Sequence, residues 1–289
     1  MSKIPTLPPG ADWPGPSRQL HDLSLRPKRR LSQSFLTSRA IAAAMVEAAE
    51  VGPADVVLEV GPGLGILTRE LLGAAGKVVS VEIDPQLAAA LPGALDSPEN
   101  LQVVVGDATR LDFGIFLVDP YLAVASLPYH VATPILFRWG FELPRPERIV
   151  VMLQEEVARR IVAAPGAMNF LAVALSTVAS ARIVRRVPPG AFFPVPKVHS
   201  AIVRLDIRET GAVAFDRAQH LVTFLRAGFT QPRRQLHNSL ALGLGKPSDA
   251  VHLLVTAEGF DPTRRPSELS LEEWVVLYKS ALNAGWLAA

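Results

Sequence analysis

The chain has 289 residues and a formal net charge of +2, with 49% apolar and 19% charged residues. This length accommodates one large and one smaller domain, and this composition is typical of a globular enzyme and excludes a wholly disordered chain. The sequence contains no cysteine, which excludes disulfide bonds, thiolate metal sites and a cysteine nucleophile. No apolar run reaches about 18 residues and the N-terminus lacks the apolar segment of a secretory signal, so we expect neither a membrane span nor secretion.

Prolines and glycines are frequent in the first 25 residues. We therefore expect residues 1–25 to form a flexible leader. A basic cluster follows, with the sequence Arg26-Pro-Lys-Arg-Arg30. It is either a solvated surface patch or an arm that binds phosphates. A helix capped by Thr37 or Ser38 is predicted next, and it should end near Gly52.

A glycine turn after the first predicted strand is the strongest local signal. Val56–Val60 is a short apolar run, and Gly61-Pro-Gly-Leu-Gly65 follows it before apolar residues recur at helical spacing. Strand, glycine turn and helix in this order begin a nucleotide-binding unit, in which the backbone approaches a ligand closely. The spacing is not that of the dinucleotide fingerprint, because Gly65 comes two residues after Gly63. A tight strand–helix connection without a ligand is the alternative.

Polar residues also follow the next three predicted strands. Residues 78–84 carry Glu82, residues 101–107 end in Asp107, and residues 121–125 lead into Ser126. An acid at the place of Glu82 can accept hydrogen bonds from both hydroxyls of a ribose. A single acid at a strand end is more often a helix cap or a turn residue, but the glycine turn after residues 56–60 together with Glu82 and Asp107 at the next two strand ends indicates a ligand site at one edge of a doubly wound sheet.

The rest of the chain divides near residue 210. Before it we predict helices over 133–139, 155–162 and 168–181, a strand over 148–154, an irregular proline-stiffened loop over 187–197 and an edge strand over 198–207. After it the pattern is helical throughout, with helices over 215–229, 231–242, 250–258 and 271–284. An α/β sheet domain is therefore followed by a small all-helical domain.

The tetrapeptide Ser126-Leu-Pro-Tyr129 has residue types that suit methylation of an exocyclic base amine. The lone pair of such an amine is delocalised into the ring, and acceptors for its two protons free that lone pair for attack. Ser126 and the carbonyl before Pro128 can supply these acceptors, and Tyr129 can stack on a base extruded from its helix. S-adenosylmethionine carries an activated methyl group, so positioning can contribute most of the rest. A proline-containing loop with a core tyrosine is the alternative.

Together these motifs resemble the KsgA/Dim family of S-adenosylmethionine-dependent rRNA adenine N6,N6-dimethyltransferases, which modify two adjacent adenines near the 3′ end of small-subunit (16S) rRNA. The resemblance covers roughly residues 26–283. It rests on the segments 28–36, 59–68, 81–84, 106–108, 126–129, 153–161, 187–200 and 229–240. It implies a Rossmann-like methyltransferase domain over residues 26–209 and a helical rRNA-binding domain over residues 210–289.

The resemblance also implies roles for individual residues. The residues expected to bind the cofactor are Gln33, Ser34, Leu36, Glu59, Gly61, Gly63, Glu82, Ile83, Asp107, Ala108 and Ser126. Among them, Glu82 would take the ribose hydroxyls, and Asp107 with Ala108 the adenine of the cofactor. The target adenine would be held by Ser126, Leu127, Pro128 and Tyr129. Phe192 and Phe193, expected to be exposed, would form a second wall for that base, with a buried plug as the alternative.

Basic residues lie where rRNA contacts are expected. We predict phosphate contacts, and hence salt-dependent binding, for the arginines and the lysine of the arm and of the helical domain: Arg26, Lys28, Arg29, Arg30, Arg226, Arg233 and Arg234. For Arg264 and Arg265 an ordinary surface role is equally compatible with the sequence.

Two departures from the family pattern bear on activity. Serine stands at positions 34 and 126, where the family usually has asparagine, and a serine hydroxyl is shorter than an amide. A reduced rate, or a role mainly in ribosome assembly, is therefore an alternative. The erythromycin-resistance branch, which methylates a large-subunit adenine, is another, although segments 187–200 and 229–240 favour the small subunit. We expect a cytoplasmic monomer that acts in small-subunit biogenesis and needs neither a metal nor a membrane.

Overall fold

The protein forms two compact units. The computed structural model describes residues 14–28, 33–118, 120–128 and 131–287. One unit contains Met1–Ala158 with Arg182–Asp206, and the other contains Arg159–Ala181 with Ile207–Ala289. The second unit therefore includes residues 159–181 in addition to the helices that the sequence predicts after residue 210.

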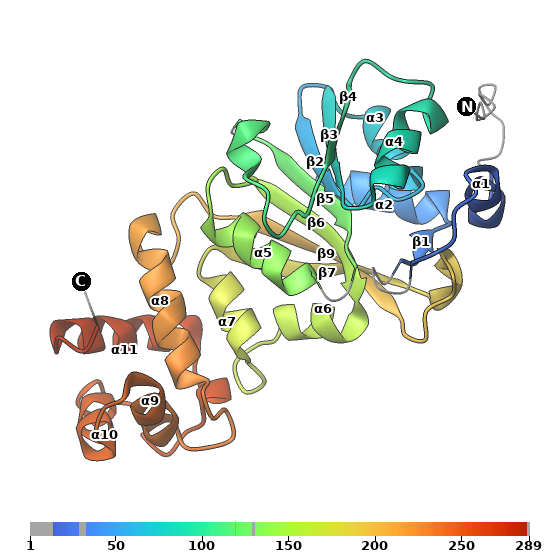
Figure 1. Cartoon of the computed structure of the whole chain (residues 1–289). Coiled ribbons are helices and arrows are strands. Elements are labelled where there is room, and N and C mark those ends of the chain that lie inside the picture. The colour runs from blue at the N-terminus through green and yellow to red at the C-terminus, as the bar shows by residue number, and fades with distance from the viewer. Residues whose placement is uncertain (1–13, 29–32, 119, 129–130, 288–289) are drawn as a thin grey trace. The chain divides into compact units, whose positions relative to one another are not determined.

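A seven-stranded sheet organises the first unit, in the order β4-β3-β2-β5-β6-β9-β7 (Figure 1). Its strands are β2 (Val56–Val60), β3 (Lys77–Glu82), β4 (Leu101–Val105), β5 (Leu122–Ser126), β6 (Arg148–Gln154), β7 (Ala179–Val187) and β9 (Ser200–Ile207). Strands β2 to β6 run parallel, and β9 is antiparallel to β6. Strands β3 and β4 are added on one side of β2, and β5 and β6 on the other. The strand order therefore reverses beside β2, which is the topological switch point of the sheet. The predicted Rossmann-like α/β fold is confirmed.

Helices connect the strands of this unit. They are α1 (Pro16–Asp22), α2 (Arg39–Ala49), α3 (Ile66–Leu72), α4 (Pro85–Ala94), α5 (Ala132–Phe141) and α6 (Glu155–Ile161), with 3₁₀ turns η2 (Phe113–Ile115) and η3 (Pro189–Ala191). Helix α4 begins where proline and aspartate favour a start: Pro85 is in its first turn, and the Asp84 carboxylate accepts a hydrogen bond from the Gln86 amide.

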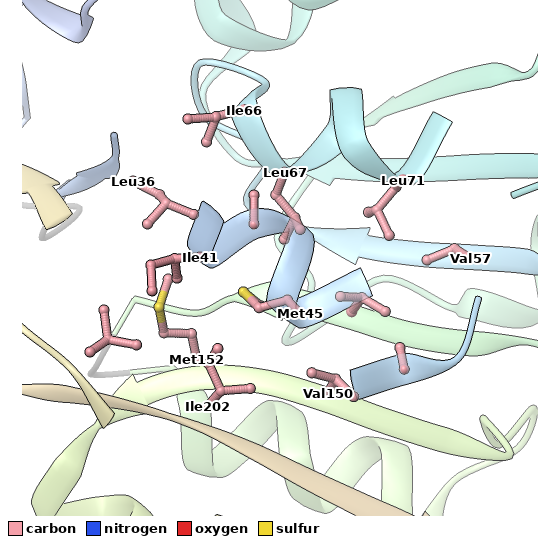
Figure 2. Close-up of a cluster of buried hydrophobic side chains, with 14 of the residues drawn as sticks. Leu36, Ile41, Met45, Val57, Ile66, Leu67, Leu71, Val150, Met152 and Ile202 are labelled. Atoms are coloured by element: carbon pink, nitrogen blue, oxygen red, sulfur yellow. The ribbon is translucent and has the colours of Figure 1, made fainter. Parts of the chain in front are cut away.

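The core of this unit covers both faces of the sheet. On one face, side chains from α2 and α3, including Met45 and Leu71, pack against Val57, Val150 and Met152 of the strands (Figure 2). The neighbouring strand residues, which point to the opposite face, are buried as well; they include Leu58, Ala123, Ile149 and Val151. Burial on both faces explains why the parallel strands read as continuous apolar runs.

Three sequence predictions for the leader, the first unit and its boundary with the second are corrected. The leader is not irregular throughout, because residues 16–22 form α1, whose Leu20 is buried; residues 1–13 lie outside the described part of the chain. The helix predicted over 168–181 ends at Ser176, and the chain enters β7 at Ala179. Strand β7 therefore forms the sheet edge, and β9, predicted there, is internal. Because five consecutive residues of β7, Arg182–Arg186, are exposed, the strand lacks the apolar alternation that reveals strands, and its arginines protect the edge.

The loop predicted over 187–197 contains a short strand. Residues Phe192–Phe193 form β8, which pairs antiparallel with β1 (Phe35–Leu36). Phe192 is buried and Phe193 is half-buried, so neither is the exposed side chain that the sequence predicts. Pairing with the distant residues 35–36 gives this segment its regular structure, and the local sequence contains no sign of it.

The second unit is largely helical. Its helices are α7 (Phe170–Ser176), α8 (Phe215–Gly228), α9 (Leu236–Leu244), α10 (Ser248–Ala257) and α11 (Leu271–Asn283), with a 3₁₀ turn η4 (Pro266–Glu268). Trp274 is fully buried at its centre, with its ring 6.1 Å from that of Phe224. Helix α9 begins at Leu236, later than the predicted start at Gln231, where Pro232 disfavours a helical backbone. No helix in the described part of the chain is both long and apolar enough to cross a membrane.

Candidate active site

A cavity opens at the carboxyl ends of β2, β3, β4 and β5, where a doubly wound sheet binds ligands. It brings together most of the residues singled out in the sequence: Gln33, Ser34, Leu36, Glu59, Gly61, Gly63, Glu82, Ile83, Asp107, Ala108, Ser126, Leu127, Pro128 and Phe192. Glu82 and Asp107 therefore border one shared cavity together with the Ser126–Pro128 segment.

The glycine turn after β2 forms one side of this cavity. Gly61, Gly63 and Gly65 have φ angles of +73°, +56° and +85°, a region that residues with a side chain rarely adopt. The Gly61 amide donates a hydrogen bond to the Val81 carbonyl at 2.9 Å, which ties the turn to β3. A Cβ atom on Gly61 would lie 3.9 Å from both Pro128 Cδ and the Ser126 carbonyl oxygen. The turn and the Ser126–Pro128 segment are thus direct neighbours.

Glu82, the last residue of β3, is fixed by backbone donors. Its Oε2 accepts a hydrogen bond from the Gly63 amide at 3.1 Å, and its Oε1 accepts one from the Asp84 amide at 2.9 Å. The side chain is only 4% exposed, and burial raises its pKa. Both carboxylate oxygens keep a free lone pair, so the group is oriented to accept two further hydrogen bonds.

Glu59, within β2, lines the cavity and has one carboxylate oxygen without a hydrogen-bond partner among the described residues. Its Oε2 accepts hydrogen bonds from Thr68 Oγ1 at 2.8 Å and Ser80 Oγ at 2.7 Å. Its Oε1 is buried and has no hydrogen-bond partner among the described residues. Burial raises the pKa of Glu59 to about 7. Its Oε1 therefore lacks the hydrogen-bond donor that a buried carboxylate oxygen normally has.

Asp107 lies just beyond β4 and forms another side of the cavity. Its Oδ1 accepts hydrogen bonds from the Thr109 amide at 2.9 Å and from Thr109 Oγ1 at 2.7 Å. These hydrogen bonds lower the pKa of Asp107, although partial burial opposes them. The carboxylate is therefore ionised at neutral pH, and its Oδ2 lies 3.8 Å from Arg110 Nε.

Ser126 ends β5, and the chain then leaves the sheet along its edge. The Leu127 amide donates to the Met152 carbonyl of β6 at 3.1 Å, and the Pro128 carbonyl accepts from the Val131 amide at 3.1 Å. These bonds hold the segment rigidly beside the glycine turn. Tyr129, predicted to stack on the base, lies outside the described residues.

Pairing of β1 with β8 places the end of the N-terminal arm, which we define as residues 26–36, at the cavity. Phe35 pairs with Phe193 and Leu36 with Phe192, so residues distant in sequence line the cavity together. Ser34 Oγ donates a hydrogen bond to the Pro194 carbonyl at 2.7 Å. The Ser34 hydroxyl therefore has a partner for its own proton.

Comparison with known proteins identifies the family. The chain matches the family described as "Ribosomal RNA adenine dimethylase" over residues 25–280. The chain belongs to this family. The predicted resemblance is thereby confirmed, and so is the interpretation of the chain as an rRNA adenine dimethyltransferase.

Individual relatives agree with this assignment. The protein named "Ribosomal RNA small subunit methyltransferase A" of Syntrophotalea carbinolica is 39% identical over 86% of this chain and 94% of its own. Its namesake from Pelotomaculum thermopropionicum is 37% identical over 90% and 93%. Among solved structures, a dimethyladenosine transferase from Plasmodium falciparum has a TM-score of 0.77 at 25% identity, covering 88% of this chain and 99% of its own. The 23S rRNA methyltransferase ErmE has a TM-score of 0.68 at 31% identity, covering 85% and 98%.

Several predicted RNA-contacting residues of this dimethylase are not among the residues that line the cavity. Phe193 is not among the lining residues, and it packs with Phe35 and Leu64. Arg226, Arg233 and Arg234 are exposed in the second unit, and the Arg226 guanidinium stacks on Phe170 at 4.7 Å. Arg29 and Arg30 lie outside the described residues. Their RNA contacts stay predictions.

Two basic side chains considered as phosphate contacts, Lys28 and Arg264, instead form ion pairs within the protein. Lys28 Nζ lies 2.7 Å from Asp84 Oδ2, and Arg264 forms hydrogen bonds of 2.6 and 2.9 Å with the Glu273 carboxylate. The pair between Lys28 and Asp84 was not predicted, because its two residues lie 56 positions apart in the sequence. In the described part of the chain, no group of three or more histidine, aspartate or glutamate side chains is arranged to hold a metal ion.

Proposed function

We propose that this protein uses S-adenosylmethionine to dimethylate the N6 amines of two adjacent adenines near the 3′ end of 16S rRNA, during biogenesis of the small ribosomal subunit. The observation that supports this most directly is the single cavity that gathers Glu82, Asp107 and Ser126 from three strand ends, in a chain of the rRNA adenine dimethylase family. The relatives named for the small subunit favour that subunit as the substrate. A cytoplasmic, monomeric protein remains our expectation.

The cavity fits the cofactor part by part. Glu82 has two positioned oxygens for the ribose hydroxyls, and the Asp107 carboxylate, next to Ala108, is suited to accept a hydrogen bond from the exocyclic amine of the adenine. The unpartnered Glu59 Oε1 is suited to accept a hydrogen bond from the amino group of the methionine part, and the glycine turn leaves room for that part. When bound, the cofactor supplies a methyl group on a positively charged sulfur, which needs no further activation.

The Ser126–Pro128 segment is suited to hold the target base. We infer that Ser126 Oγ and the Leu127 carbonyl accept hydrogen bonds from the two N6 protons, which localises the nitrogen lone pair for attack on the methyl group. The amine loses one proton for each methyl group that it gains. Phe192, buried in the same cavity wall, excludes water from the face of the base.

A large-subunit substrate is the second candidate, because the chain is 31% identical to an enzyme titled as a 23S rRNA methyltransferase. Transfer of radiolabelled methyl groups to isolated undermethylated small subunits and to large subunits distinguishes the two. We expect label on the small subunit, at two adjacent adenines. Label on the large subunit alone would favour the second candidate, and no label on either would contradict the proposed activity.

The role of Ser126 has a direct test. We expect Ser126→Ala to lower kcat by about tenfold to a hundredfold, because one acceptor lost from a buried site costs about 1–3 kcal/mol. Ser126→Asn, which restores a longer acceptor, should retain or increase kcat. The matched control is Ser180→Ala, since Ser180 is exposed on β7. Full activity of Ser126→Ala would exclude the serine as an acceptor. An inactive wild type that still binds small subunits would support the assembly role.

Arg233 and Arg234 are expected to contribute to RNA binding through their charge. Both are exposed. Arg233→Ala with Arg234→Ala should weaken small-subunit binding and reduce the slope of log K against log salt by about 1.5, since each neutralised phosphate contributes about 0.7–0.9. Filter binding at several salt concentrations measures this. The double control Lys246→Ala with Lys279→Ala should leave the slope unchanged, and equal effects of both variants would contradict a specific contact.

A further inference from the structure

An ion pair links the start of the N-terminal arm to the turn between β3 and α4. Lys28 Nζ lies 2.7 Å from Asp84 Oδ2 and 3.2 Å from Gln86 Oε1. Gln33, five residues further along the arm, donates to Asp84 Oδ2 at 3.4 Å and accepts from the Lys28 amide at 2.8 Å. Two points of the arm therefore meet at one carboxylate.

The Asp84 carboxylate is more deeply buried than a helix cap requires. Its side chain is 2% exposed, whereas that of Lys28 is 30% exposed. Its capping role needs only the Gln86 amide, which donates to Oδ1 at 3.1 Å, so Oδ2 remains for the arm. Burial raises the pKa of Asp84, but hydrogen bonds from Lys28, Gln86 and Gln33 outweigh burial and lower it overall. The carboxylate is therefore charged at neutral pH, and Lys28 is its cationic partner.

The same turn also positions the ribose-binding group. The Asp84 amide donates to Glu82 Oε1 at 2.9 Å, so the backbone that carries the anchoring carboxylate also orients the Glu82 side chain. Beyond the anchor, the arm contributes Gln33, Ser34, Phe35 and Leu36 to the cavity wall. Lys28 itself does not line the cavity in the described part of the chain.

We propose that Lys28 is a positioning residue for the cofactor: by pairing with Asp84 it holds residues 33–36 against the cavity wall at the Glu82 end. This inference rests on the proposed function, because it assumes that S-adenosylmethionine occupies the cavity. It assigns Lys28 to cofactor binding and removes it from the RNA-contacting residues. Because the carboxylate is buried, the pair is screened little by salt, unlike an exposed phosphate contact.

Substitutions that keep shape and remove charge test the pair. Lys28→Met keeps the aliphatic stem, and Asp84→Asn keeps an oxygen that can cap α4. Each should raise the Kd for S-adenosylmethionine about tenfold in calorimetry without RNA. The double variant should also lose only about tenfold, because each single change already breaks the same contact. In steady-state methylation kinetics, Lys28→Met should raise the KM for the cofactor and leave kcat unchanged.

The pair of Arg39 and Glu70 provides a matched control. It joins α2 and α3 of the same unit at 2.7 Å, and neither residue lines the cavity. Arg39→Met and Glu70→Gln should leave the Kd unchanged. Amide hydrogen exchange gives a second readout: cofactor should slow exchange of residues 33–37 in the wild type and much less in Lys28→Met. Lys28 is partly exposed, so this variant is expected to fold even if Asp84→Asn does not.

The outcomes separate this inference from the function on which it rests. A Lys28→Met variant that binds the cofactor as tightly as the wild type would overturn the positioning role alone. A double variant with a Kd about a hundredfold above that of the wild type would also overturn it. Such a Kd would mean that the two single substitutions act independently and not through one shared contact. A wild-type protein that does not bind S-adenosylmethionine would instead overturn the proposed function.

Discussion

Replacing Glu82 by glutamine is expected to raise the Kd for S-adenosylmethionine about a hundredfold. The carboxylate accepts one backbone hydrogen bond on each oxygen, from Gly63 and from Asp84. Glutamine has one acceptor oxygen, so its NH₂ group would face a backbone N–H and the side chain would turn away. The charge that strengthens two hydrogen bonds to the ribose would also be lost. Charge-assisted bonds contribute about 1.5–3 kcal/mol each, and about 3 kcal/mol corresponds to a hundredfold.

Calorimetry with the cofactor and thermal unfolding without it check this prediction together. Glu70→Gln, on α3 and away from the cavity, serves as the control and should bind normally. Binding of small subunits by Glu82→Gln should persist, because three of the predicted phosphate contacts, Arg226, Arg233 and Arg234, lie in the second unit. A folded Glu82→Gln protein with a Kd within threefold of the wild type would exclude Glu82 as the ribose acceptor.

The sheet and its ligand edge could be predicted because their signals are local. The predicted strand over 148–154 has the observed bounds of β6, and Val56–Val60 is β2 as predicted. In a parallel sheet, all carboxyl ends meet at one edge, so placing Glu82, Asp107 and Ser126 at strand ends also predicts that they lie together. The structure confirms this, because all three residues line the same cavity. Their proximity follows from the parallel sheet and requires no information about long-range contacts.

The features that the sequence did not reveal depend on contacts between distant segments. Strand β8 exists because Phe192 and Phe193 pair with residues 35–36, more than 150 positions earlier. Strand β7 is an exposed edge, so no apolar alternation marks it. The partner of Lys28 is 56 residues away, and a basic cluster alone does not distinguish a phosphate contact from an internal ion pair. Propensity and periodicity contain no information about such pairings.

Glu59→Gln is expected to stabilise the protein above pH 7. Burial raises the pKa of Glu59 from 4.5 to about 7, so the folded protein holds this proton more tightly than the unfolded chain does. Its contribution to stability is therefore fully present below pH 4.5 and is lost as the pH rises through about 7. At about 1.4 kcal/mol per unit, the loss is roughly 3 kcal/mol, and glutamine avoids it. Denaturant unfolding at pH 5 and pH 8 should show the variant gaining stability relative to the wild type, and equal pH profiles would contradict this.

Glu59→Gln should also weaken cofactor binding. A carboxylate that destabilises the fold at this position in β2 would then be retained for its contribution to binding. Thr68 and Ser80 already satisfy Oε2, so the energetic cost lies with the unpartnered Oε1 in the cavity wall. An ammonium group placed there would stabilise the ionised carboxylate, so wild-type affinity for S-adenosylmethionine should rise between pH 5.5 and pH 7.5. Glu59→Gln should bind about tenfold more weakly at pH 7.5, with an affinity independent of pH in this range. A wild type and variant with parallel pH dependence would show that Oε1 does not contact the ammonium group, and that its buried charge serves no purpose in binding the methyl donor.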